Sequence, residues 1–224
     1  MIRKLCLAVY IVFFVKIFFG QQLNGKFVQN ADSMVATLDL SRENDIDYLT
    51  DTLTTPFKGD SLKVRAIYFW ITEHIRYDCK KYREYIMQHY EKQPEDMDND
   101  QWEYKKVWAT VKHKKGVCQD YAELFNYMCK EIHVPCEIIS GFASDNELLL
   151  KLKSESCLHA WNAVMINKKW YLLDVCWASG SVEIKSDKFI KGRNDFYYLT
   201  PPEKFSKTHW PENKSWFLLP EREK

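Results

Sequence analysis

Cys118 is the residue of this sequence whose position best suits a nucleophile. It follows Gly116 and Val117 and opens a stretch with apolar residues at helical spacing, so its sulfur should lie among unpaired N–H groups at the positive end of a helix dipole. This environment favours the thiolate, the nucleophilic form of cysteine. Because a helix end contributes at most about 2 kcal/mol, or ~1.5 pK units, full activation requires a second positive partner, normally a histidinium.

His159 and Asp174 are the candidates for that partner and for a carboxylate that orients it. Asp174 interrupts the apolar run 171–177, where an ionised carboxylate is costly without a partner. If residues 167–168 form a two-residue hairpin loop, Trp161 faces Asp174 and His159 becomes its diagonal neighbour on the same sheet face. Nucleophile, base and orienter then form a Cys-His-Asp triad.

Three blocks of the sequence resemble those of the transglutaminase-like superfamily: Lys115–Ala122, His159–Val164 and Trp170–Trp177. Residues 71–78 resemble the helix that precedes the core in its kyphoscoliosis-peptidase-like branch, and residues 194–219 resemble the tail of bacterial exported members. The likeness covers roughly residues 50–219. It implies a papain-like α+β fold, in which N-terminal helices carry the nucleophile at a helix N-terminus packed on a small antiparallel sheet.

The resemblance also implies roles for the three residues. Cys118 would be the nucleophile, His159 the general base and acid, and Asp174 the orienter. Many relatives have Gly where Asp120 stands, and a carboxylate there would oppose thiolate formation, so we expect Asp120 to point away from the sulfur. The second oxyanion donor is left open between three candidates besides the backbone N–H of Cys118: Gln119, Trp70 and Trp108.

Further residues near the three blocks are candidates for substrate binding: Gln119, Trp161, Asn162 and Trp177. Packing in the core is the competing interpretation for an aromatic residue on a central strand. The remaining histidines are interpreted as surface or structural residues: His74, His89, His113, His133 and His209.

The periodicity of the chain predicts helices first and strands later. Helices are expected over 60–75, 80–91, from about 102 to a left-handed stop at Gly116, and over 118–131. Strands are expected over 134–142, 159–166 and 170–177. This order indicates an α+β domain rather than a βαβ repeat.

Residues 1–20 have the pattern of a secretory signal. A positive head at Arg3 and Lys4 precedes an apolar run over 5–15, and Gly20 is a small residue suited to cleavage. The run is too short to span ~30 Å of hydrocarbon. We expect a signal peptide over 1–20, a polar, irregular lead-in over 21–50 and the transglutaminase-like domain over 51–219. The chain would be secreted or periplasmic without a transmembrane segment in the mature form; an uncleaved N-terminal membrane anchor is the alternative.

The composition of the chain argues against several classes of binding partner. Of 224 residues, 32 are Lys or Arg and 31 are Asp or Glu, so no basic excess points to nucleic acid. The cysteines show no CxxC spacing and there is no HExxH, so neither a metal nor a cofactor is expected. Export would permit disulfides, whose pattern is left open: Cys79, Cys129, Cys136, Cys157 and Cys176.

The expected function is acyl transfer at amide or peptide bonds through a thioester on Cys118. Hydrolysis, as in a protease or amidase, is favoured over protein crosslinking by a transglutaminase; the triad is the same in both. A non-catalytic module that binds a peptide or protein is the alternative from another class. The partner is a peptide or protein with an exposed carboxamide or peptide bond, and the oligomeric state is left open.

Overall fold

The computed structural model describes residues 28–86, 92–154, 157–183 and 185–220. The predicted signal peptide and the end of the predicted helix 80–91 lie outside these residues. In the described part, no helix is both long and apolar enough to cross a membrane.

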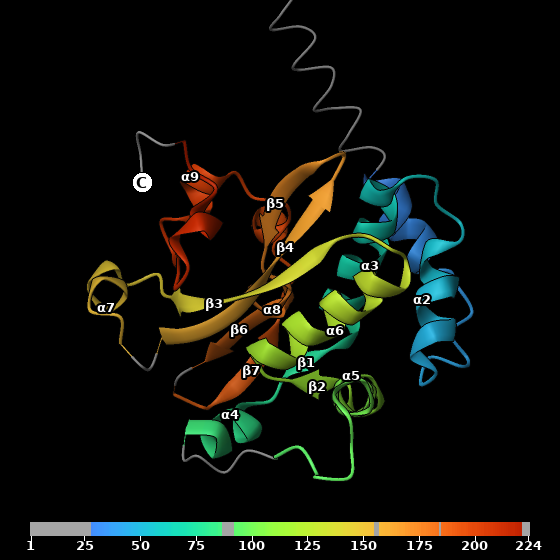
Figure 1. Cartoon of the computed structure of the whole chain (residues 1–224), viewed down its shortest axis with the longest axis horizontal. Helices are drawn as coiled ribbons and strands as arrows, with labels where there is room; N and C mark the ends of the chain where they lie inside the picture. The colour runs from blue at the N-terminus through green and yellow to red at the C-terminus, as the bar shows by residue number, and fades with distance from the viewer. Residues whose placement is uncertain (1–27, 87–91, 155–156, 184, 221–224) are drawn as a thin grey trace, which may run out of the picture.

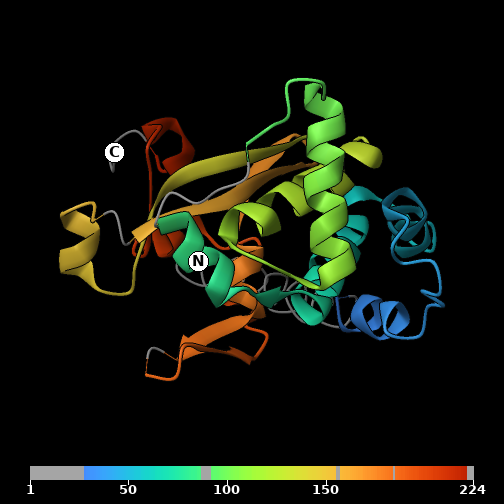
Figure 2. The ribbon, with the colours of Figure 1, turned by 90° about the horizontal axis from the view of Figure 1, so that it is seen from below.

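The fold is α+β, as predicted, with helices packed on an antiparallel sheet. The sheet has the order β5-β4-β3-β8, formed by Lys169–Leu173, Leu158–Ile166, Cys136–Ala143 and His209–Pro211. Helix α6 (Cys118–Glu131) lies against it, and α2 (Ile46–Thr54) and α3 (Asp60–His74) continue the helical layer on the side away from α7 (Glu147–Lys151) (Figures 1 and 2).

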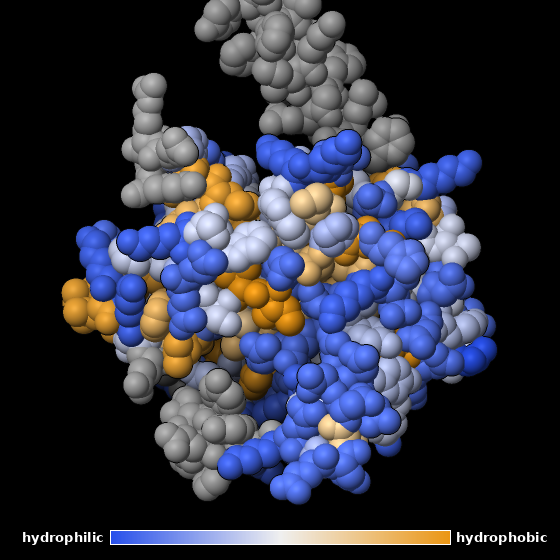
Figure 3. Space-filling view, viewed as in Figure 1, coloured by the Kyte–Doolittle hydropathy of each residue, from blue (hydrophilic) through white to orange (hydrophobic). Residues whose placement is uncertain are grey.

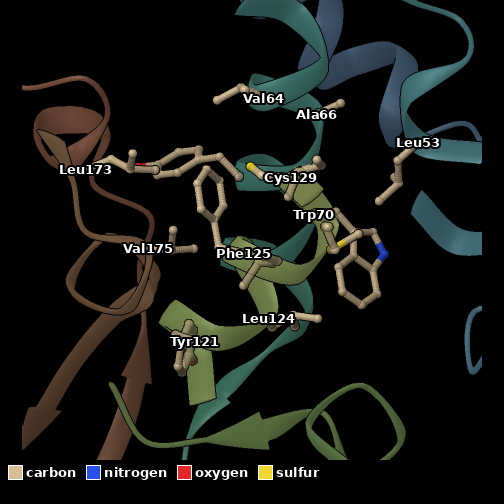
Figure 4. Close-up of a cluster of buried hydrophobic side chains, with 14 of the residues drawn as sticks. Leu53, Val64, Ala66, Trp70, Tyr121, Leu124, Phe125, Cys129, Leu173 and Val175 are labelled. Atoms are coloured by element: carbon tan, nitrogen blue, oxygen red, sulfur yellow. The ribbon is translucent and has the colours of Figure 1, made fainter. Parts of the chain in front are cut away.

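The main core lies between α3, α6 and the sheet. Trp70 and Ile71 of α3 and Phe125 of α6 are fully buried in it, and Figure 4 shows Trp70, Leu124 and Phe125 among the side chains that fill this space. Burial of a large apolar side chain stabilises a fold by about 1.5–3 kcal/mol. Because the apolar face of α6 is buried along its length, the position of its N-terminus is fixed.

The hairpin register of β4 and β5 is the predicted one. Ile166 pairs with Lys169 and Asn162 pairs with Leu173, and positive φ at 167 and 168 gives the loop the twist that a two-residue hairpin needs. The strand prediction for 170–177 is wrong beyond Leu173. Asp174 leaves the sheet and caps the short helix α8 (Val175–Ser179).

The predicted helix over 118–131 is confirmed with its bounds, whereas the helix before it ends differently. Helix α5 (Asn99–His113) ends at Lys114, which has a φ of 53°, rather than at Gly116. Gly116 belongs to strand β2 (Lys115–Gly116), which pairs in parallel with β1 (Arg76–Tyr77). The helix predicted over 80–91 is α4 (Cys79–Ile86) in the described residues.

The prediction of an irregular lead-in over 21–50 is wrong for part of that segment. Residues 28–35 are helical, and Ala31 and Val35 are buried in the main core. Arg65 of α3, itself buried, binds both carboxylate oxygens of Asp32 at 2.7 and 2.6 Å and also binds Asp195. This ion pair holds the first described helix against the domain.

Smaller elements complete the chain. Strands β6 (Gly180–Glu183) and β7 (Lys188–Lys191) form a separate hairpin. The tail contains η2 (Asp195–Tyr197), α9 (Pro202–Phe205), β8 and η3 (Lys214–Phe217). A second apolar cluster is formed between the tail and the sheet by Ile139, Trp161, Ala163, Leu172 and Phe205.

Candidate active site

Cys118 is the first residue of α6. Val117 precedes it in extended conformation as the N-cap, so the Cys118 thiol lies beside the first turn, where backbone N–H groups lack helical acceptors. Asp120 in this turn accepts the N–H of Val117 at 2.7 Å and the ammonium group of Lys81 at 2.7 and 2.8 Å. The negative charge of Asp120 is thereby paired with Lys81.

His159, the second residue of β4, contacts a buried carboxylate. Its Nε2 lies 2.7 Å from Oδ2 of Asp174, which leaves Nδ1 for another partner. Burial lowers the pKa of His159, but the charge of Asp174, the charge of Cys118 and hydrogen bonds with both raise it to about 10. The imidazolium form of His159 is therefore favoured over the neutral ring.

Asp174 is fully buried at the N-terminus of α8. Its Oδ1 accepts the N–H of Trp177 at 2.9 Å, and its own N–H donates to the carbonyl of Tyr197 at 3.0 Å. Burial raises the pKa of Asp174, but His159 and a second histidine lower it far more, to well below the ordinary carboxyl range. The carboxylate is thus held ionised in the interior.

The second histidine is His209, which the sequence analysis treated as a surface or structural residue. It is buried, and its Nε2 lies 3.0 Å from Oδ2 of Asp174. The sequence offered one indication that His209 is buried: aromatic residues lie near it in the tail, with Phe205 before it and Trp210 directly after it. Nothing in local spacing links position 209 to position 174.

A groove of about 830 Å³ reaches Cys118 and His159, whereas Asp174 and His209 are not among the described residues that line it. Its lining includes Cys118, His159 and Trp177. Apolar side chains form parts of its walls: Leu149 and Leu158 on one side, and Val182 and Ile190 of the β6–β7 hairpin. Figure 3 shows apolar residues gathered on the side of the molecule that carries α7.

Of the predicted substrate-binding residues, Trp177 alone is among the described residues that line the groove. The side chain of Gln119 donates to Glu123 at 3.1 Å. Asn162 is buried and donates to the carbonyl of Ala122.

The structure also does not bring Trp161 to the groove. Its side chain packs in the second apolar cluster, so the packing interpretation applies. The oxyanion candidates Gln119, Trp70 and Trp108 are likewise not among the described groove residues, and Trp70 is fully buried. This leaves the backbone N–H groups at the start of α6 as the donors nearest to Cys118 in the chain.

The ligand atoms of His159, Asp174 and His209 lie within 4.8 Å of one another, a spacing that could hold a metal ion. Both imidazole nitrogens already lie at hydrogen-bond distance from one oxygen of Asp174. A metal ion would have to replace both hydrogen bonds. Three further cysteines line the groove together with Cys118: Cys79, Cys157 and Cys176. Within the described residues, no disulfide joins any two cysteines.

Comparison with known proteins identifies the class. A family model described as the transglutaminase-like superfamily matches residues 47–175. The chain therefore belongs to the transglutaminase-like superfamily, as the three sequence blocks predicted.

Relatives within this class include two mammalian proteins. The chain is 33% identical to kyphoscoliosis peptidase of Mus musculus over 175 residues, which are 78% of this chain and 24% of that protein. The human kyphoscoliosis peptidase is 33% identical over 181 residues, covering 80% of this chain and 25% of that protein. The chain thus spans about a quarter of the length of these relatives. A solved structure of a TGase matches 75% of this chain and 35% of its own chain, with a TM-score of 0.41 and 15% identity.

Proposed function

We propose that this chain is a thiol-dependent enzyme that hydrolyses amide bonds in peptides. The observation that carries the proposal is the hydrogen bond of 2.7 Å between Nε2 of His159 and Oδ2 of Asp174, in a groove that also holds Cys118 at a helix N-terminus. This combination supplies a nucleophile, a base and an orienter. Kyphoscoliosis peptidase, by its name, acts on peptides, which favours hydrolysis over crosslinking.

The reaction follows from these positions. The thiol proton of Cys118 moves to Nδ1 of His159, and the thiolate sulfur attacks the carbonyl carbon of the substrate. The resulting oxyanion is stabilised by backbone N–H groups at the start of α6. His159 then returns the proton to the leaving nitrogen as the C–N bond breaks, leaving a thioester and a free amine.

Water completes the cycle. It attacks the thioester carbonyl while His159 takes one of its protons; the C–S bond then breaks, and His159 passes this proton to the sulfur, which releases a carboxylic acid and the Cys118 thiol. If a lysine amine replaced water, the product would be a crosslink instead. Asp174 keeps its negative charge throughout and holds the ring of His159 in one tautomer and orientation.

Alkylation of Cys118 provides the first test. With iodoacetamide at mildly acidic pH, we expect Cys118 to react at least tenfold faster than the same cysteine in denatured protein, because the thiolate is stabilised by His159. The His159→Ala variant should lose this advantage. Equal rates for native and denatured protein would reject the enzyme and support the non-catalytic binding module.

Product analysis separates the remaining alternatives. The protein is incubated with a peptide library and with casein plus a primary amine, in the presence of a chelator, with Cys118→Ser as the control. New carboxyl termini or deamidated side chains that depend on Cys118 support hydrolysis. Incorporation of the amine without hydrolysis would contradict the proposal and establish crosslinking.

We propose further that residues 1–20 direct export to an envelope or extracellular setting. The supporting pattern is the positive head followed by the apolar run over 5–15. Mass spectrometry of the mature N-terminus tests this: cleavage near Gly20 is expected, and an intact Met1 would favour the anchored alternative.

A further inference from the structure

His209 contacts the same carboxylate oxygen that holds His159. It lies on β8, where it pairs with Ala143 at the end of β3. Its Nε2 is 3.0 Å from Oδ2 of Asp174, compared with 2.7 Å for Nε2 of His159. One buried oxygen therefore lies between two imidazole rings that come from strands far apart in the sequence.

Burial and the hydrogen bond with Asp174 together indicate the protonation state of His209. Burial lowers its pKa, although Asp174 acts in the opposite direction, so the ring is neutral and carries one proton. Because a carboxylate can only accept, that proton lies on Nε2. Nδ1 lies 2.8 Å from the hydroxyl of Thr208, which is also within hydrogen-bond distance of the carbonyl of Phe205.

Aromatic neighbours fix the ring. Phe205 stacks on it with a centroid distance of 4.0 Å, and Trp177 and Trp161 meet it nearly edge-on at 4.8 and 5.1 Å. The direction of the Nε2–H bond is therefore set by packing rather than by Asp174. A fixed donor of this kind can impose an orientation on the group that it binds.

Asp174 needs such an imposed orientation. A carboxylate at the start of a short helix can rotate about its last side-chain bond, which has a broad energy minimum. The backbone N–H of Trp177 restrains this rotation through one hydrogen bond to Oδ1, and Nε2 of His209 restrains it a second time through Oδ2. Binding of Oδ2 by His209 directs this oxygen to the position from which it meets His159.

We propose that His209 is a positioning residue that holds the carboxylate of Asp174 in the orientation required by His159. This proposal rests on the proposed function, because its effect is expressed through the reactivity of Cys118. His209 does not touch substrate and exchanges no proton in the reaction. It completes a Cys-His-Asp-His arrangement in which only His159 becomes an imidazolium.

Two substitutions of His209 separate positioning from packing. His209→Phe keeps an aromatic ring between Phe205 and Trp177 but removes the donor, whereas His209→Gln keeps an N–H donor on a comparable reach and removes the ring. His74→Phe is the matched control, because His74 also stacks on an aromatic ring, that of Trp70, and its Nδ1 contacts the carbonyl of Trp70. Each variant is compared with wild type by thermal unfolding, by the rate of Cys118 alkylation and, with a cleaved peptide, by kcat and KM.

We expect His209→Phe to fold and to lower kcat and the alkylation rate by about tenfold to a hundredfold, the range of a small misplacement of catalytic groups, with KM within about twofold. His209→Gln should restore most of the lost rate, and His74→Phe should leave it unchanged. A His209→Phe variant as fast as wild type, or a folded His209→Gln variant no faster than His209→Phe, would overturn the proposal. Absence of a His159-dependent alkylation rate in wild type would instead reject the proposed function itself.

Discussion

Gly116 and Asp120 approach so closely that a Cβ atom at position 116 would lie 2.6 Å from the Cβ of Asp120 and 2.9 Å from its Oδ2. Both residues flank Cys118, and Oδ2 of Asp120 accepts the N–H of Val117. The backbone before Cys118 thus folds onto the first turn of α6. Position 116 requires glycine for this close approach and not for a left-handed conformation.

Gly116→Ala is predicted to displace the first turn of α6. The obstructing Cβ of Asp120 is attached to the helix backbone, so it cannot move without the turn that holds Cys118. Overpacking of this kind costs about 1–3 kcal/mol of unfolding free energy, and the shift should slow iodoacetamide alkylation of Cys118 by about tenfold. Thermal unfolding and alkylation rates measure the two effects.

Gly59→Ala is the control for that experiment. Gly59 has a φ of 85° and open space around its Cα, so alanine there should cost about 1–3 kcal/mol through backbone strain. Alkylation of Cys118 should stay unchanged. An equal loss of reactivity in both variants would show that general destabilisation, rather than the contact with Asp120, governs the position of Cys118.

The parts of the fold that local physics determines were predictable from the sequence. The bounds of α6 follow from its apolar spacing, and the two-residue loop at 167–168 fixes the register of β4 and β5. His159 and Asp174 meet as predicted, although Asp174 does so from the cap of α8 rather than from a strand. The hairpin brought the two residues close, and a local helix start turned the carboxylate.

Long-range contacts explain what the sequence analysis missed. His209 reaches Asp174 across 35 positions, and Arg65 reaches Asp32 across 33. Neither separation has a periodic signature, because such pairs form only after strands and helices have docked. Trp161 shows the opposite case. Its position two residues after His159 suggested that it binds substrate, whereas its side chain packs with Phe205 in the second apolar cluster.

Arg65→Met is predicted to destabilise the protein strongly. Arg65 is buried and binds both oxygens of buried Asp32, together with Asp195. Breaking a buried ion pair costs about 3–5 kcal/mol. Because Arg193 still lies 3.1 Å from Oδ2 of Asp32, we expect a loss near the lower end of that range. Denaturant unfolding measures the loss.

Arg42→Met provides the comparison for Arg65. Arg42 pairs with Asp45 with side chains 62% and 43% exposed, so its removal should cost less than about 1 kcal/mol. If both variants lost the same free energy, the pair of Arg65 and Asp32 would not anchor the first described helix.

Stability should depend on pH through the two histidines of Asp174, with opposite signs. Burial lowers the pKa of His209 from 6.5, so the unfolded chain binds a proton first and stability falls as pH drops below about 6.5. His159 has its pKa raised to about 10, by Asp174 and Cys118 against the effect of burial, so its contribution is present below about 6.5 and is lost as pH rises towards 10. Each slope is at most about 1.4 kcal/mol per pH unit.

Denaturant unfolding from pH 4.5 to pH 10 tests these signs. His209→Gln should flatten the acid side of the profile, and His159→Gln should flatten the alkaline side. His159, Asp174 and Tyr197 face His209, and all three remain in the His209→Gln variant. An acid side that is as steep in His209→Gln as in wild type would show that His209 is already protonated in the folded protein.

The apolar walls of the groove should select bulky apolar side chains next to the bond that is cut. Leu149 and Ile190 line the groove while 37% and 52% exposed, and covering such surface with a substrate side chain contributes about 25 cal/mol per Å². Leu149→Ser and Ile190→Ser should each lower kcat/KM for apolar peptides by about threefold to tenfold, with little change for peptides that have small polar residues there. Leu152→Ser is the matched control, since Leu152 is 68% exposed near α7 but is not among the described groove residues. Equal losses for Leu152→Ser, or for both classes of peptide, would show that these walls do not select the substrate.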